Sequence, residues 1–282
     1  TFDNLRTYDI KLNPEKCVFG VPARKLLGFI VSSRGIEANP AKIRALSQLA
    51  IPTDLKQIQK LTGCVAALSR FISRLGEMTL PLYRLFRRTE HFEWTDAAMA
   101  GLEEIKAILA TNPILAAPNV GELMLLYIAA THQVVSAVLV VERETDGHKF
   151  PLQKPAYYVS TVLTPCKSRY PHYQKLAYAV FMASRKLRHY FQECSITVAS
   201  EVPLNDIINN RNATGQIAKW AIELLPFDIT YKPRRAIKLQ VLADFVAEWT
   251  EAELPKEFGA YSNRIMHFDG SKMLAGLGGW RH

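Results

Sequence analysis

The sequence has no long apolar run, no paired cysteines and no signal peptide. No apolar run approaches the roughly 20 residues of a membrane-spanning helix, and the runs 123–130 and 134–141 have the length of strands. The four cysteines are far apart and form no C-x-x-C pair. That spacing argues against a disulfide framework or a zinc knuckle and fits a reducing compartment. The chain also lacks an initiator Met, so we expect a segment of a longer protein.

Negative charge is missing from residues 147–192. Residues 101–146 carry two basic and six acidic residues, whereas 147–192 carry no carboxylate. The whole chain has 35 Lys and Arg against 26 Asp and Glu, a formal net charge of +9. A positive field concentrated in one segment favours a polyanionic partner. The basic residues of that segment are Lys149, Lys154, Lys167, Arg169, Lys175, Arg185, Lys186 and Arg188.

The first 110 residues change from strand composition to helical spacing. Residues 1–8 predict the end of a helix, and 17–20 and 26–32 predict strands. Apolar residues then recur at three and four positions from Leu55 to Leu75, which predicts one helix that begins at Thr53 or Asp54 and stops at Gly76. A second helix is expected after Thr95. We therefore expect a small all-helical unit over 40–110.

The next 140 residues predict a mixed sheet with helices. Strands are expected at 123–130, 136–142 and 153–159, with Asp146-Gly147 as a turn between the last two. A long helix over 170–191, a strand at 196–200, a helix at 217–224, a strand at 227–231 and a helix at 241–249 follow. Three antiparallel strands and then alternating helices and strands predict a mixed α/β domain. Residues 251–264 are expected to be a linker, and a final strand is expected to begin at 264–268.

Several stretches, taken in order, resemble consecutive parts of a gypsy-type LTR-retrotransposon reverse transcriptase. Residues 11–20 (KLNPEKCVFG), 27–31 (LGFIV) and 34–40 (RGIEANP) are similar to the end of its palm, and 58–71 to its thumb. Residues 91–200, which open with FEWT, resemble the RNase H-like domain that follows, and WAIEL and LADF resemble its end. FDGS at 268–271 is similar to the opening strand of a second RNase H.

The resemblance implies a fold of the α+β or α/β class, in which a helical thumb precedes an RNase H-like mixed-sheet domain. The expected divisions are the palm end (1–39), the thumb and linker (40–118), a degenerate RNase H-like connection domain (119–250), a linker (251–264) and the truncated second RNase H (265–282). The two polymerase aspartates of the family lie upstream of the chain's first residue. The fragment is therefore not expected to synthesise DNA.

The metal ligands that RNase H requires show whether the connection domain is expected to be catalytic. Such enzymes hold two Mg²⁺ ions about 4 Å apart with four carboxylates, and Mg²⁺ requires hard oxygen ligands. At the family's four positions this chain has Ala129, Gln174, Glu201 and Asp244. Alanine and an amide cannot replace anionic ligands, so we expect no cleavage and no tightly bound Mg²⁺ here. Asp244 and Glu201 remain as remnants, although helix-start or solvated carboxylates are the plainer interpretation of both.

Asp269 is interpreted as the first carboxylate of the second RNase H. A strand followed by Asp-Gly-Ser and small residues suits a first metal ligand, but Asp-Gly-Ser is also a common turn. The resemblance favours the interpretation of Asp269 as a metal ligand, and this ligand would hold metal only in the full-length parent. His132, His148, His172 and His189 have no carboxylate or cysteine at metal spacing and are interpreted as ordinary surface or core residues.

Two groups of cations are candidates for phosphate contacts. On the thumb, Lys56, Lys60, Arg70 and Arg74 are expected opposite the apolar stripe. The second group is Lys167, Arg169, Arg185 and Arg188. For both groups a solvated helix face is the alternative. The aromatic residues of the same stretch, such as Tyr173, Phe181 and Tyr190, are expected to pack in the core instead of stacking on bases.

Three functional hypotheses follow. The chain is part of a polyprotein whose parent is an RNA-directed DNA polymerase and hybrid ribonuclease, it is a module that binds RNA–DNA hybrid or duplex without chemistry, or it is an RNase H-like interaction module of a host protein. The substitutions at Ala129 and Gln174 favour binding without catalysis. Expected partners are nucleic acid and the other Pol domains (polymerase palm, RNase H, integrase), with no membrane. A retroelement product is expected in a cytoplasmic particle or the nucleus.

Overall fold

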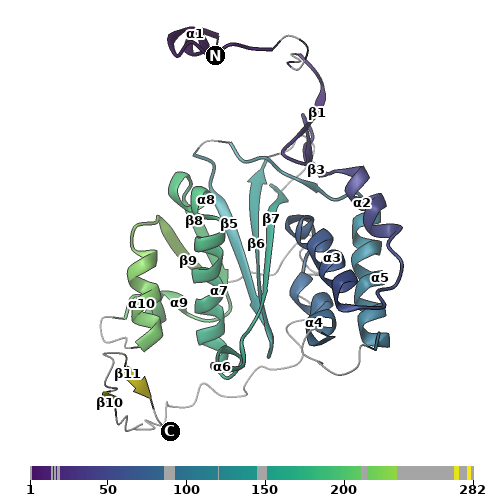
Figure 1. Ribbon diagram of the computed structural model, residues 1–282. Helices are drawn as coiled ribbons and strands as arrows, with labels where there is room; N and C mark the ends of the chain where they lie inside the picture. Colours follow the sequence, from purple (N-terminus) through teal and green to yellow (C-terminus); the bar gives the residue numbers. More distant parts are fainter. Residues whose placement is uncertain are drawn as a thin grey trace. The chain divides into compact units, whose positions relative to one another are not determined.

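The structure is a computed structural model (Figure 1) that describes residues 2–13, 15, 17, 20–85, 93–119, 121–144, 151–210 and 215–233, and the backbone of 270–272 and 278–280. The chain divides into two compact units, Thr1–Trp249 and Thr250–His282. In the second unit the described strands β10 (Gly270–Lys272) and β11 (Gly278–Trp280) pair antiparallel. Asp244, Asp269 and the predicted elements at 146–147, 241–249, 251–264 and 264–268 lie outside the described residues.

The N-terminal part forms a helix and a small antiparallel sheet. Helix α1 spans Phe2–Thr7, and strands β1 (Ala23–Leu26), β2 (Phe29–Ser32), β3 (Gly35–Ala38) and β4 (Ile114–Leu115) pair in that order. Leu27 and Gly28 have φ of 48° and 86°, which is the geometry of a tight two-residue hairpin turn. The strand predicted at 17–20 is wrong for Cys17 and Gly20, which lie outside any strand.

Four helices and a short 3₁₀ turn follow. They are α2 (Pro40–Ser47), α3 (Leu55–Ala66), η1 (Ser69–Phe71), α4 (Leu75–Leu85) and α5 (Asp96–Ala110). The predicted starts are confirmed, because the side chains of Asp54 and Thr95 accept hydrogen bonds from Gln57 N and Ala98 N.

The single helix predicted from Leu55 to Leu75 is wrong. It ends at Ala66, yet Leu68, Phe71 and Ile72 beyond it are all fully buried. A 3₁₀ turn and a short loop bury the same apolar residues that a continued helix would have placed on one face. The predicted stop, Gly76, lies inside α4 and is buried.

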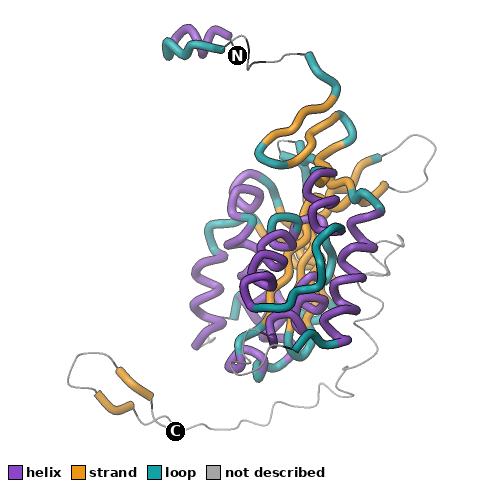
Figure 2. The backbone as a smooth tube through the Cα atoms, turned by 45° about the vertical axis from the view of Figure 1, so that its right-hand side comes forward, coloured by secondary structure: helices purple, strands orange, loops and turns teal. Residues whose placement is uncertain are grey.

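A five-stranded mixed sheet forms the centre of the first unit (Figures 1 and 2). Its strands are β5 (Met124–Ala130), β6 (Val134–Arg143), β7 (Leu152–Val162), β8 (Ile196–Ser200) and β9 (Ile229–Pro233). The order is β7-β6-β5-β8-β9, with β5, β6 and β7 antiparallel and β8 and β9 parallel to β5. The predicted central position of the first strand, β5, is confirmed.

The other described helices of the first unit are α6 (Pro165–Ser168), α7 (His172–Lys186), α8 (Arg188–Glu193), α9 (Leu204–Ile208) and α10 (Gly215–Leu224). The predicted helix over 170–191 is interrupted at Leu187, which has φ of −113° and ψ of 31° and is fully buried. Leu187 keeps the apolar spacing of a continuous helix, so this break between α7 and α8 could not be found from the spacing alone.

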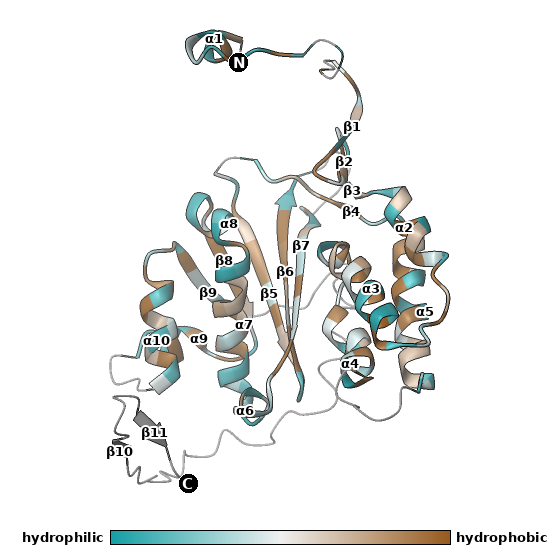
Figure 3. Cartoon of the chain, viewed as in Figure 1, coloured by the Kyte–Doolittle hydropathy of each residue, from teal (hydrophilic) through white to brown (hydrophobic). Residues whose placement is uncertain are grey.

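Helices cover both faces of the sheet, as the side chains that alternate between the two faces of β6 show. Val135, Ala137 and Leu139 belong to a core that includes residues of α7, whereas Val138 and Val140 belong to a core that includes residues of α3–α5. Strands apolar on both faces need cover on both faces, and Figure 3 shows this apolar character along β6. The helical segment is therefore packed on the sheet, as one wall of the same compact unit.

Candidate functional site

The predicted carboxylate positions of β5 and β8 lie together. These strands run parallel with Tyr127 beside Ala199; Ala129 lies two residues further along β5, and Glu201 two residues further along the chain. Ala129 is buried, and Glu201 directly follows the end of β8. Both residues therefore lie towards the same end of two neighbouring strands, and their interpretation as former carboxylate positions stays a prediction.

The first turn of α7 reaches the same place. His172 Nε2 lies 3.0 Å from Glu201 Oε1, and Gln174 is two residues further along that turn. Lys175, which is 5% exposed, donates a 3.2 Å hydrogen bond to the carbonyl oxygen of His132, just beyond β5. The remaining carboxylate, Glu201, therefore faces a histidine, and a buried ammonium group lies one residue after Gln174.

These residues do not fit a pair of Mg²⁺ ions. Of the three described positions only Glu201 offers an anionic oxygen, whereas Ala129 has none and Gln174 has an amide. In the described part of the chain no three His, Cys, Asp or Glu side chains gather in a group that could hold a metal ion. Divalent-metal hydrolysis requires several such ligands, so no catalytic step is assigned to this end of the sheet.

The first group of cations divides into two exposed lysines and two arginines that contact other side chains. Lys56 and Lys60 lie exposed on α3. Arg70 and Arg74 are not on that helix, because it ends at Ala66; their predicted place opposite its apolar stripe is wrong. Arg74 has φ of +53° and its Nε lies 2.9 Å from Glu77 Oε2, so its charge is partnered.

Arg70 is held by aromatic rings. Its Cζ atom lies 4.5 Å from the ring centre of Tyr157 on β7, 5.0 Å from Phe29 on β2 and 6.0 Å from Phe71. The Nε atom is buried and has no hydrogen-bond partner among the described residues. Stacking of this kind stabilises a planar guanidinium on aromatic faces. Arg70 thus joins the hairpin to the large sheet, a role that its place in the sequence does not reveal.

The second group of cations divides in the same way. Lys167 Nζ donates a 2.9 Å hydrogen bond to Tyr178 Oη and lies 4.4 Å from the centre of that ring. Arg185 lies 5.5 Å from the ring centre of Phe181, and its Nε is 4.0 Å from Glu223 Oε2. Arg169 and Arg188 are exposed and have no acidic partner among the described residues. The predicted core packing of Tyr173, Phe181 and Tyr190 is confirmed.

Lys186 is a cation that sequence reasoning did not select. Its Nζ donates hydrogen bonds to the carbonyl oxygen of Ser160, at 3.3 Å, and to Thr161 Oγ1, at 3.0 Å, on the edge strand β7. Desolvation lowers the pKa of Lys186 below its ordinary value. Its neighbours on the sequence give no sign of this position, because the contact depends on how α7 crosses the sheet.

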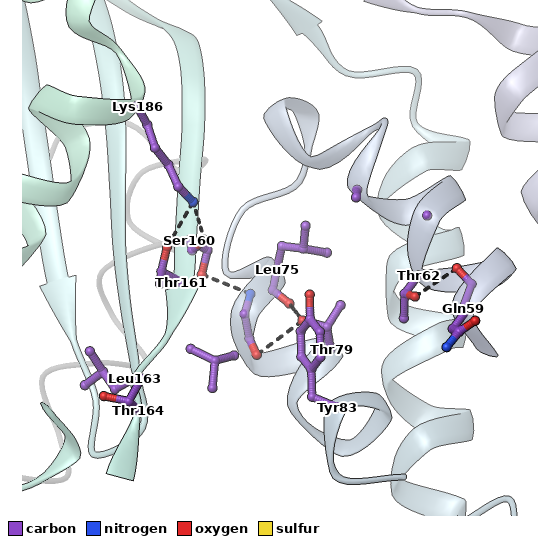
Figure 4. Close-up of a pocket in the computed structure, with 14 residues that line it drawn as sticks. Gln59, Thr62, Leu75, Thr79, Tyr83, Ser160, Thr161, Leu163, Thr164 and Lys186 are labelled. Carbon is purple, nitrogen blue, oxygen red and sulfur yellow. Dashed lines mark hydrogen bonds between the residues drawn. The ribbon is translucent and has the colours of Figure 1, made fainter. Parts of the chain in front are cut away.

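Lys186 borders a groove of about 860 Å³ between the helical segment and the sheet (Figure 4). One wall is the face of α3 that carries Gln59 and Thr62, and the opposite wall is the end of β7 with the two residues that follow it, residues 160–164. Helix α4 contributes Leu75, Gly76, Thr79 and Tyr83. A smaller pocket of about 280 Å³ lies at the ends of β8 and β9, beside Glu201.

Comparisons with known proteins agree on one family of relatives. Residues 94–198, from before α5 into β8, match the RNase H-like domain found in reverse transcriptase. The chain is 26% identical over 229 residues to the retrovirus-related Pol polyprotein from transposon 297 of Drosophila melanogaster, covering 79% of this chain and 20% of that protein. It is 24% identical over 266 residues to the transposon Tf2-3 polyprotein of Schizosaccharomyces pombe, covering 90% and 19%.

Solved structures share the fold. The foamy viral protease-reverse transcriptase in complex with an RNA/DNA hybrid matches with a TM-score of 0.63 at 19% identity, over 77% of this chain and 30% of that one. The dRH form in complex with double-stranded DNA matches with 0.62 at 20% identity, over 76% and 38%. The predicted fold class and the predicted resemblance to LTR-retrotransposon Pol polyproteins are confirmed.

The chain spans about a fifth of the length of the curated relatives that it matches. Among its described residues, no helix has both the length and the apolar character required to cross a bilayer.

Proposed function

We propose that this chain, which is similar to a segment of the Pol polyproteins of LTR retrotransposons, binds duplex nucleic acid, RNA–DNA hybrid in particular, and performs no chemistry of its own. The observation that carries the proposal is the exposed face of α3 opposite Lys186. Lys186 lines the groove on one side, and Lys56 and Lys60 are exposed on α3, the helix that forms its other side, in a protein of net charge +9. Phosphate contacts of this kind supply most non-specific affinity for duplexes.

The face of α3 suits a nucleic-acid backbone. Lys56 and Lys60 are one helical turn apart and exposed, so both ammonium groups are available on one side. Gly63 follows, and a Cβ there would have nothing within 4 Å. A helix face with two cations and no bulky side chain allows close approach of a sugar–phosphate chain. Arg169 and Arg188 add exposed charge on α6–α8.

Relatives support the same reading. The foamy viral enzymes of matching fold are complexes with double-stranded DNA and with an RNA/DNA hybrid. In the parent polyprotein, DNA synthesis and hybrid cleavage would belong to the polymerase palm and to the RNase H that Asp269 begins, with Mg²⁺ as the metal. Those domains and the integrase are the proposed protein partners. The five-part division of the chain stays a prediction.

Lack of chemistry in this chain is proposed from its residues. Ala129 and Gln174 replace two anionic ligands, and Glu201 is occupied by His172. Asp244 and Asp269 remain proposed as remnant and parent-enzyme ligands. A site without the charge to hold two Mg²⁺ ions cannot activate water between them.

The test measures affinity for a short RNA–DNA hybrid at several salt concentrations. Counterion release gives a log–log slope of about −0.9 per neutralised phosphate, and roughly three to five such contacts are expected. Replacing Lys56 and Lys60 together by Ala should make the slope less steep by the contribution of about two phosphate contacts. The matched control replaces Lys219 and Lys232, which are exposed on α10 and β9. An unchanged slope in the α3 variant contradicts the proposal.

A further inference from the structure

We propose that the groove between α3, α4 and the end of β7 recognises the ribose 2′-hydroxyls of an RNA strand. The inference rests on the proposed function and narrows it: phosphate contacts hold any duplex, and the groove selects duplexes that contain RNA. Three features of the groove support it, namely the arrangement of charge, the unpaired polar groups and the occupied edge of β7.

Charge lies at the borders of the groove and is absent from its lining between them. At 100° per residue, the groove-lining positions 59, 62, 63 and 66 form one stripe of α3. Lys56 and Lys60 lie on the adjacent stripe, outside the groove. Lys186 lies on the far wall (Figure 4). A sugar–phosphate chain has the matching pattern, with anionic phosphates at intervals and uncharged sugars between them.

The lining offers hydrogen-bonding groups that the protein does not use. The side-chain amide of Gln59 and the hydroxyl of Thr164 make no hydrogen bond with any described residue, although Thr164 occupies the N-cap position of α6. Thr62 Oγ1 donates back to the carbonyl oxygen of Ile58 at 2.9 Å and keeps its acceptor lone pairs. A 2′-hydroxyl is both a donor and an acceptor, so amide and hydroxyl partners can bind it.

Small residues let a sugar reach these groups. Gly63 and Ala66 line the α3 wall. On the opposite side Gly76 brings α4 directly against β7. Between the walls, uncharged side chains including Leu75 and Val162 offer apolar surface for the carbon atoms of a ribose ring.

An extended peptide fits this groove less well. A peptide that adds to an edge strand needs the outward carbonyl oxygens and amides of that strand. On β7 the ammonium group of Lys186 already occupies the carbonyl oxygen of Ser160 and the hydroxyl of Thr161. A lysine placed on a sheet edge is a device that blocks strand addition. The cationic borders likewise favour a polyanion.

The experiment compares three duplexes of one sequence with the full chain. They are a DNA duplex, an RNA–DNA hybrid and a hybrid whose RNA strand carries 2′-fluorine, which keeps an A-like sugar but removes the donor. We expect tighter binding of the RNA hybrid than of either other duplex. Gln59→Leu with Thr164→Val should weaken hybrid binding by about tenfold, as expected for two lost neutral hydrogen bonds, and change DNA binding less than about twofold.

The control variant carries the same chemical changes elsewhere. Gln216 and Thr111 are exposed on α10 and at the end of α5, and Gln216→Leu with Thr111→Val should leave all three affinities unchanged. Equal binding of the RNA and 2′-fluoro hybrids would overturn the inference, because the protein would then read shape alone. So would an equal loss for DNA and hybrid in the groove variant. If no duplex shows salt-dependent binding, the proposed function itself fails.

Discussion

The backbone N–H of Gly76 donates a 2.9 Å hydrogen bond to the hydroxyl of Ser160, 84 residues away in the sequence. The same hydroxyl lies 2.8 Å from that of Ser136 on β6. Helix α4 is therefore joined to two strands through its first turn, where backbone N–H groups have no partner within the helix. This contact fixes the helical segment against the sheet and forms one end of the groove.

Gly76→Ala should destabilise the protein. A Cβ at Gly76 would lie 2.7 Å from both Ser160 Oγ and Val134 Cγ1, closer than any ordinary contact. Overpacking of a tight interface costs about 1–3 kcal/mol, and we expect a loss of that size in the free energy of unfolding, measured with denaturant. Gly63→Ala is the control. There the new methyl meets open space, so the better helix propensity of alanine should stabilise by about 0.5–1 kcal/mol. Equal effects of the two substitutions would contradict this packing.

Glu122→Gln should remove part of the stability that depends on pH. Glu122 forms a two-pronged pair with Arg143, at 2.8 and 2.9 Å, and accepts from Asn119 N at 2.8 Å. The hydrogen bonds from Arg143 lower the pKa of Glu122 below its ordinary 4.5. A lowered carboxyl pKa stabilises the fold above pH 4.5, and this stabilisation is lost as the pH falls through the lowered value.

We therefore expect Glu122→Gln to cost about 2 kcal/mol near neutral pH and progressively less in acid. Denaturant titrations of both proteins from pH 7 downward measure the difference. A difference that stays constant with pH would mean that the carboxylate charge contributes nothing.

Elements with a strong local signal could be predicted from the sequence. The strands β5–β8 follow from apolar periodicity, and the helix starts at Asp54 and Thr95 follow from their capping side chains. The break after Ala66 could not, because Leu68, Phe71 and Ile72 keep helical spacing while packing from a turn. Nor could the contacts of Arg70 with Phe29 and Tyr157, or those of Lys186 with Ser160 and Thr161, be predicted, since these partners lie on other elements and at least 25 residues away in the sequence.

Arg70→Met should lower stability without changing nucleic-acid binding. Its guanidinium contacts the rings of Tyr157, Phe29 and Phe71, and cation–π contacts contribute about 0.5–1 kcal/mol each. A loss of about 2 kcal/mol with an unchanged salt slope for hybrid binding is expected. Arg70→Lys keeps the charge but not the planar stack and should also destabilise. A flatter salt slope of hybrid binding in either variant would show that Arg70 contacts phosphates.

The full chain should neither extend a primer nor cleave an RNA–DNA hybrid in Mg²⁺. The expectation for hybrid cleavage follows from Ala129 and Gln174, which supply no anionic ligand where two metal ions would need them. Product analysis on gels after long incubation measures both activities. Cleavage that disappears on Asp244→Asn would show that the remnant site is active after all.

The four cations Lys167, Arg169, Arg185 and Arg188 should separate into two functional pairs. Lys167 and Arg185 contact the rings of Tyr178 and Phe181, which pack on Trp220, so replacing this pair by Ala should reduce stability by about 1–2 kcal/mol. Arg169 and Arg188 are exposed, so replacing them should leave stability unchanged and flatten the salt slope of hybrid binding by up to about two contacts.

Thermal unfolding and hybrid affinity at several salt concentrations, measured for both pairs, distinguish the two roles. If the pair Arg169 and Arg188 changes neither quantity, this helix face is only solvated, and phosphate contacts belong to α3 and Lys186 alone. If replacing Lys167 and Arg185 changes the salt slope of hybrid binding but not the stability, these two side chains contact phosphates, and their aromatic contacts contribute little to stability. The aliphatic parts of Lys167 and Arg185 would then lie on the core without contributing measurably to the free energy of unfolding.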